Sequence, residues 1–129
     1  MNKKILIVAC LLGLTGVIIG AFAAHGLKAL ITADALKAFE TGVRYHMYHA
    51  FLLLFLGSTS LISNKIKRYV FYLVLTGLVL FSGSIYALAT NVLTSFNFKT
   101  IGFITPIGGL LLIGAWALLF VSFLKLKEK

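Results

Sequence analysis

The chain has 129 residues, of which 60% are hydrophobic and only 12% are charged, and its mean hydropathy is +1.05. Soluble globular chains are about half apolar and about a quarter charged, so this composition excludes a water-soluble domain and a disordered chain. The single cysteine, Cys10, excludes an intramolecular disulfide.

Charged residues divide the chain into four long apolar runs, each free of Asp, Glu, Lys and Arg. At about 1.5 Å per residue each run is long enough to cross the hydrocarbon core of a bilayer. Lipid offers the backbone no hydrogen-bond partners, so these runs are expected to be helices. The chain is therefore predicted to be an all-α integral membrane protein in one domain, residues 1–129. The expected fold is a four-transmembrane-helix bundle with spans near 5–24, 46–63, 69–90 and 101–124.

The distribution of Lys and Arg predicts an orientation. With four spans, the two termini and the loop at 65–68 share one side and carry eight of the 12 basic residues. Because basic residues concentrate on the cytoplasmic side, both termini are expected in the cytoplasm of a bacterium, with the spans in its inner (plasma) membrane. The expected partners are membrane lipids, with anionic headgroups on the cytoplasmic side. Other membrane proteins or a homo-oligomer stay open as partners, and nucleic acid is not expected.

The segment at about 32–45 is too polar to span a membrane. Thr32 or Asp34 can cap a helix there, and apolar residues then recur at helical spacing. We predict an amphipathic helix in the first extracytoplasmic loop, lying at the outer interface and running into the second span. A plain connector with one helical turn is the alternative. The apolar residues of the pattern are Leu36, Phe39 and Val43.

Small residues and one proline predict how the helices pack. Gly16 and Gly20 form a small-xxx-small pair in the first span, which allows close contact with another helix of the chain or with a second copy. In the fourth span, Pro106 is expected to free a backbone carbonyl and kink the helix. Gly108 and Gly109 follow it and let another backbone approach closely.

Polar side chains from all four spans fall at one depth, in the outer half of the membrane. Polar and ionisable residues within spans usually face the bundle interior, so we treat this layer as the candidate site. Its predicted members are His25, Arg44, Tyr45, His46, His49, Ser82, Ser84, Tyr86 and Thr105.

The chemistry of this layer is restricted by what it lacks. His46 and His49 are three residues apart and share a helix face, and imidazoles from them and His25 could bind zinc, copper or haem iron. No Cys, Asp or Glu is predicted at that depth to complete a metal site, so no cofactor is expected and His25 and His49 stay as the metal candidates. The spans hold no carboxylate for proton-coupled transport. The sequence also lacks a Ser-His-Asp set and an HExxH motif, so catalysis is not expected.

Four motifs in order carry a resemblance to a known family. They are the stretches 20–27, 41–50 and 81–86, and Thr105–Gly109 followed by Trp116. Together they resemble the YgdD-like family of small inner-membrane proteins, a domain-of-unknown-function family (number 423) with a small eukaryotic transmembrane relative. The resemblance implies a multi-pass bacterial plasma-membrane protein and implies no particular reaction. The chain departs from the family at Ala23, where Gly is commoner, and at His46, where Gln is frequent.

Three functions are consistent with the sequence. The first is a non-enzymatic structural or accessory protein for membrane integrity or homeostasis. The second is a small-solute or ion transporter with a polar site in the outer half of the bundle. The third is a metal or haem protein that binds through His25 and His49.

Overall fold

A computed structural model describes residues 2–93 and 102–127, and every regular element in these residues is helical. The elements, in chain order, are α1 (Asn2–His25), η1 (Leu27–Ala29), α2 (Ala33–Ser58), α3 (Asn64–Leu78), η2 (Val79–Gly83), α4 (Ser84–Ala89), η3 (Asn91–Leu93) and α5 (Ile104–Leu124). The predicted all-α class is confirmed. The start of the predicted fourth span, residue 101, lies outside the described residues.

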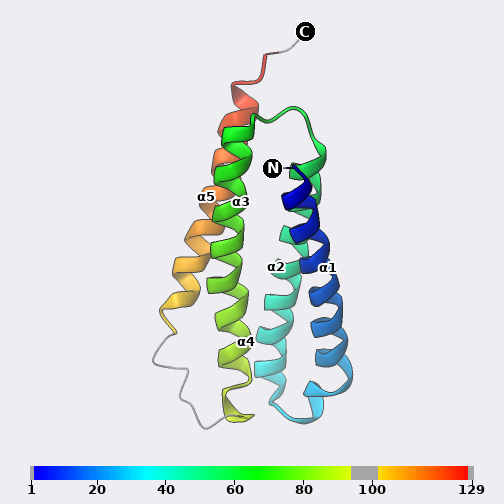
Figure 1. Cartoon of the computed structure of the whole chain (residues 1–129). Coiled ribbons are helices and arrows are strands. Elements are labelled where there is room, and N and C mark those ends of the chain that lie inside the picture. Colours follow the sequence, from blue (N-terminus) through cyan, green and yellow to red (C-terminus); the bar gives the residue numbers. More distant parts are fainter. Residues whose placement is uncertain (1, 94–101, 128–129) are drawn as a thin grey trace.

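The helices form two antiparallel hairpins that pack side by side (Figure 1). α1 packs along α2, and the rod made by α3, η2 and α4 packs along α5. α2 and this rod join the two hairpins. The first turn of α1 and the last turn of α5 lie at the end of the bundle that also holds the α2–α3 loop, which we call the terminal end (Figure 1). We call the opposite end the loop end.

Among the described residues, three helices are long and apolar enough to cross a membrane, namely Asn2–Ala29, Asn64–Ala89 and Ile104–Leu124. α2 falls outside this group, and its first half carries Asp34, Lys37, Glu40 and Arg44. Large apolar side chains are exposed along α1 and α5, among them Val17 and Leu110. Because such a surface is stable in lipid and not in water, the structure agrees with a membrane protein of several spans.

Residues 33–45 are helical and run into the second span as one continuous helix, α2, but they pack differently from the prediction. The Thr32 hydroxyl caps this helix by accepting a hydrogen bond from the Ala35 N–H at 3.1 Å. A Cβ built on Gly20 would meet Val43 at 3.3 Å, so the segment stands beside α1 and does not lie flat as a loop helix. The reason is packing, since its apolar side chain Phe39 is buried against Tyr86 of α4.

The second and third predicted spans are shifted relative to the observed helices. α2 ends at Ser58, five residues before the predicted end. α3 begins earlier than predicted, at Asn64, because the Ser63 hydroxyl accepts a hydrogen bond from the Ile66 N–H at 3.3 Å and so caps it. The basic cluster at 65–68 therefore belongs to the first turns of α3.

Pro106 does not kink α5. The helix begins at Ile104, so Pro106 lies in its first turn, where a backbone N–H has no intrahelical acceptor. The expected loss of a hydrogen bond to the Gly102 carbonyl therefore does not arise. Pro106 helps to start the helix instead, since its fixed φ suits the first turn.

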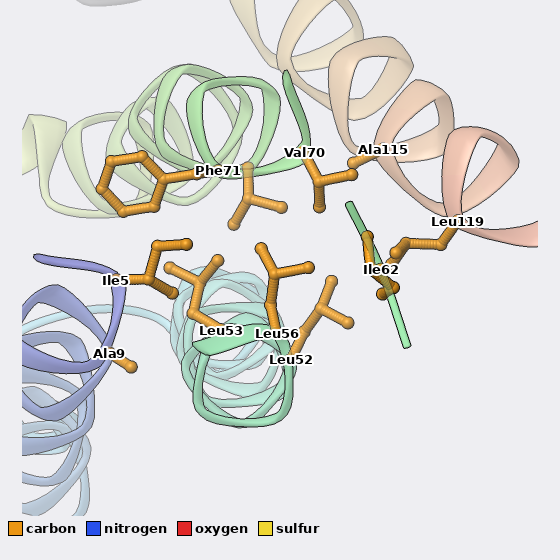
Figure 2. Close-up of a cluster of buried hydrophobic side chains, with 11 residues drawn as sticks. Ile5, Ala9, Leu52, Leu53, Leu56, Ile62, Val70, Phe71, Ala115 and Leu119 are labelled. Carbon is orange, nitrogen blue, oxygen red and sulfur yellow. The ribbon is translucent and has the colours of Figure 1, made fainter. Parts of the chain in front are cut away.

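The main apolar core lies toward the terminal end and receives side chains from all four long helices (Figure 2). Ile5 of α1 and Leu53 of α2 meet Phe71 of α3 and Ala115 of α5 there. A second, smaller cluster at the loop end joins α1, η1, α2 and α4 through Ala23, Leu27, Phe39 and Ala89. The two clusters leave the polar residues between them.

Candidate functional site: a polar layer between the helices

His46 lies at the centre of a hydrogen-bonded junction of three helices. Its Nε2 is 2.9 Å from the Leu12 carbonyl oxygen and 3.1 Å from Thr15 Oγ1, both on α1. Its Nδ1 is 2.9 Å from the Tyr86 hydroxyl on α4. A carbonyl oxygen can only accept, so Nε2 carries the proton and donates to Leu12, and Nδ1 accepts from the Tyr86 O–H. Both ring nitrogens of a neutral imidazole are thereby used.

His49 forms a second junction, one helical turn further along α2. Trp116 of α5 donates its indole N–H to His49 Nε2 at 3.2 Å. His49 Nδ1 lies 2.7 Å from the Tyr45 carbonyl oxygen. Because an indole N–H only donates, Nε2 is the acceptor and Nδ1 carries the proton. His49 is thus a neutral imidazole of the opposite tautomer to His46, and its nitrogens are also both used.

Two serines complete the layer and link the rod made by α3, η2 and α4 to its neighbours. Ser82 is buried and donates its hydroxyl to the Gly42 carbonyl of α2 at 2.8 Å. The Ser84 hydroxyl shares a short hydrogen bond of 2.5 Å with Thr105 Oγ1 at the start of α5. α2 and α5 are therefore both linked to the segment at 82–86.

A π-helical turn, η2, places these serines. η2 runs from Val79 to Gly83 between α3 and α4, and such turns are frequent at functional sites. The backbone of α5 crosses the rod at this point, because a Cβ built on Gly108 would lie 2.7 Å from the Gly77 carbonyl oxygen. Only a glycine allows two backbones to approach so closely. Sequence patterns gave no indication of the π-helical turn.

The glycines of the first span also face a neighbouring helix of the same chain. A Cβ on Gly16 would clash with the Met47 sulfur and lie 3.1 Å from the His46 ring. Gly109 is less tightly placed, with Phe81 ring atoms at 3.5 Å and beyond. The small residues that the sequence singled out therefore lie at helix contacts within the chain.

Three predicted members of the polar layer lie outside it. His25 ends α1 and its side chain is exposed. Arg44 is also exposed and donates to the Thr41 hydroxyl of its own helix at 2.9 Å. Tyr45 contributes its backbone carbonyl to His49, while its ring packs on Phe81 at a centroid distance of 4.9 Å.

Two residues of the layer were missed as site residues in the sequence. Thr15 gave no signal in the sequence, because the hydroxyl of a threonine in an apolar helix usually donates a hydrogen bond to a backbone carbonyl of the preceding turn. The Thr15 hydroxyl does donate to the Leu11 carbonyl at 3.0 Å. Trp116 was noted only as part of a family motif. A tryptophan predicted within a span needs a partner for its N–H, and that requirement would have pointed to His49.

The buried polar side chains of the layer already have hydrogen-bond partners within the chain. Within residues 2–93 and 102–127, each buried side-chain nitrogen or oxygen has a hydrogen-bond partner. The same residues hold no group of three His, Cys, Asp or Glu side chains that could bind a metal ion. The layer thus consists of paired polar groups that join helices.

Comparison with known proteins places the chain in a family. A family model described as "Protein of unknown function (DUF423)" matches residues 19–109. A UPF0382 membrane protein of Haemophilus influenzae is 39% identical over 128 residues, which cover 99% of each chain. The chain belongs to the DUF423 family. The resemblance noted in the sequence is thereby confirmed.

Other DUF423 relatives are as long as this chain and also carry membrane names. The UPF0382 membrane protein YwdK of Bacillus subtilis is 36% identical over 126 residues, covering 95% of this chain and 98% of the relative. The UPF0382 inner membrane protein YgdD of Escherichia coli K12 is 34% identical over 131 residues, covering 99% and 95%. No solved structure matches the chain. Together with the apolar helices, these names identify a bacterial multi-pass membrane protein.

Proposed function

We propose that this DUF423 protein is a non-enzymatic structural or accessory protein that supports membrane integrity or homeostasis. The single observation that carries the proposal is the closed polar layer. Both nitrogens of His46 and of His49 are committed to groups on the same chain, as are the hydroxyls of Ser82 and Ser84. Fully satisfied polar networks in an apolar surrounding fix one arrangement of the helices.

The proposal includes four membrane spans with both termini in the cytoplasm of the bacterium, in its inner membrane. α2 is the element that the apolar criterion leaves out, yet its 26 residues stand alongside α1 over most of their length. If α1 crosses the bilayer, its partner in the hairpin must also cross. The excess of Lys and Arg at the terminal end supports the cytoplasmic side for that end.

The transporter and metal alternatives receive no support from the described residues. A metal site would need His25 close to His49, but His25 lies exposed at the end of α1. A transport site would need polar groups that exchange partners with a solute, but the buried ones are already paired. The proposed interactions of the protein are therefore with its surroundings, namely membrane lipids, other membrane proteins or a second copy.

Deletion of the gene tests the proposal, with complementation by the native chain and by two variants. We expect the deletion strain to leak small dyes and to be sensitive to envelope stress, with unchanged uptake of solutes. Gly114→Ala adds a methyl group that meets no atom within 4 Å and should complement fully, whereas Gly108→Leu forces α5 from the rod and should not. Proteoliposomes that move a solute only when His49 is intact would contradict the proposal, as would a purified protein that retains stoichiometric metal or haem.

A further inference from the structure

A shallow groove follows α3 and η2 on the surface of the bundle. Its first part has a volume of about 350 Å³ and is lined by Tyr72, Leu75, Thr76, Val79 and Leu80. A second part of about 210 Å³ shares Leu75 and Val79 with the first and reaches Leu12 of α1. We call these two adjoining depressions together the α3 groove. Its far part also touches the polar layer at His46, Ser82 and Tyr86, beside Gly83.

Two basic residues from different helices stand near Tyr72 at the terminal end of the α3 groove. The Lys4 ammonium of α1 donates to the Tyr72 hydroxyl at 2.9 Å and lies 5.2 Å from the centre of that ring. Arg68 is one helical turn before Tyr72 on the same face of α3, and its side chain is exposed. This end of the groove therefore carries two cations near one tyrosine.

These cations have no carboxylate near them in the part of the chain that the structure describes. The acidic residues there are Asp34 and Glu40, and both belong to the half of α2 at the loop end. Lys4 uses one of its three N–H donors on Tyr72, and Arg68 presents a guanidinium fork. An anion with several oxygens would satisfy the remaining donors, and a phosphate is the group that such a pair binds best.

The length of the α3 groove matches one leaflet. Gly83 lies eleven positions after Tyr72, which corresponds to about 16 Å along a helix. Half of the hydrocarbon core of a bilayer is about 15 Å thick. The far end of the groove is open, because a Cβ built on Gly83 would meet no atom within 4 Å. One acyl chain that starts at the charged terminal end of the groove would therefore end near Gly83.

We propose that the α3 groove is a binding site for one anionic phospholipid of the leaflet at the terminal end. Lys4 and Arg68 bind its phosphate, and one acyl chain lies along Leu75 and Val79. Basic residues between helices on one side of a membrane are a known way to hold anionic headgroups. The site rests on the proposed membrane role only in that the helices must lie in a bilayer.

Native mass spectrometry of the full-length protein in mild detergent tests the headgroup half of the site. The probes are phosphatidylglycerol and phosphatidylcholine with the same acyl chains. We expect the native protein to bind one phosphatidylglycerol at least tenfold more tightly than phosphatidylcholine. The double variant Lys4→Gln/Arg68→Gln should lose this preference. Lys65→Gln/Lys125→Gln removes the same charge from two exposed positions outside the groove and should keep it.

Two further variants separate binding from folding and test the acyl half of the site. Lys4→Arg/Arg68→Lys keeps both charges and should keep the preference. Gly83→Leu fills the far end, so it should weaken binding of a long-chain phosphatidylglycerol at least threefold and leave a six-carbon-chain analogue unaffected. Equal weakening of the binding of both analogues would contradict the proposed position of the acyl chain.

Three outcomes would overturn the lipid site. They are equal affinity of the native protein for the two lipids, equal loss of preference in both charge-removing pairs, and a lipid-free dimer that forms through the groove. Any of these would leave the membrane role intact if the deletion strain still leaked. A stable deletion strain together with a specific bound lipid would instead contradict the proposed function alone.

Discussion

Gly108 should be the most sensitive glycine in the chain, because its neighbours are backbone atoms of the facing rod. A Cβ at this position would lie 2.7 Å from the Gly77 carbonyl oxygen and 2.7 Å from the Leu80 carbonyl carbon, and would also clash with the Phe81 nitrogen. Backbone atoms cannot rotate away as a flexible side chain can. Gly108→Ala must therefore push α5 away from α3 and η2.

The magnitude follows from two opposing effects. Overpacking a tight contact costs about 1–3 kcal/mol, and the rigid surroundings of Gly108 favour the upper part of that range. Alanine is preferred over glycine in a helix by about 1 kcal/mol, which offsets part of the cost. The net loss in the free energy of unfolding should be about 2 kcal/mol.

Gly114→Ala is a matched control on the same helix. A Cβ at Gly114 would meet no atom within 4 Å, so only the helix preference acts and the variant should be at least as stable as the native chain. Unfolding of both variants in mixed micelles with increasing sodium dodecyl sulfate, followed by far-ultraviolet circular dichroism, should separate them by about 3 kcal/mol. If Gly108→Ala is as stable as Gly114→Ala, the close crossing of α5 with the rod is refuted.

Three other substitutions test the hydrogen bonds in the same unfolding assay. Trp116→Phe removes the donor to His49 and should cost about 1 kcal/mol, and no change would mean that this bond is not formed. His46→Leu leaves the Tyr86 hydroxyl without its partner and should cost about 1–3 kcal/mol, while His46→Gln, with its own donor and acceptor, should recover at least half. Lys67 is only 2% exposed and donates to Asn2 Oδ1 at 2.9 Å and to the Thr59 carbonyl at 2.5 Å. Lys67→Met should cost about 1–3 kcal/mol. Lys65 is exposed, so Lys65→Met should cost under about 0.5 kcal/mol. Equal costs of the two substitutions would contradict the buried role of Lys67.

Much of the fold could be predicted from the spacing of charged residues. Charged side chains are costly inside a bilayer, so the runs without them mark the spans. The all-α class and the positions of α1 and α5 were predictable in this way, apart from small shifts at their ends. The packing of residues 33–45 could not be predicted in this way. The charges of Lys37, Glu40 and Arg44 mark a polar face of this segment, but they do not reveal that the opposite face packs on α1 and α4.

The candidate site was predictable in its depth and less so in its membership. Helical rise alone placed His49, Ser84 and Thr105 in one layer, and the structure joins each of them to another helix. The pairings depend on helix rotation and on the π-helical turn, which no local pattern encodes. Lys67 shows the same limit, since a lysine in a basic loop cluster gives no local sign that it will be buried.

The protonation of the His46 and His49 side-chain nitrogens tests the closed polar layer most directly. Solid-state NMR of the ¹⁵N-histidine-labelled protein in lipid bilayers at neutral pH reports which nitrogen of each ring carries a proton. We expect two neutral rings of opposite tautomer, with the proton on Nε2 of His46 and on Nδ1 of His49. Added zinc should leave both rings unchanged. A zinc-dependent shift, a doubly protonated ring or matching tautomers would contradict a polar layer that serves only to hold the helices together.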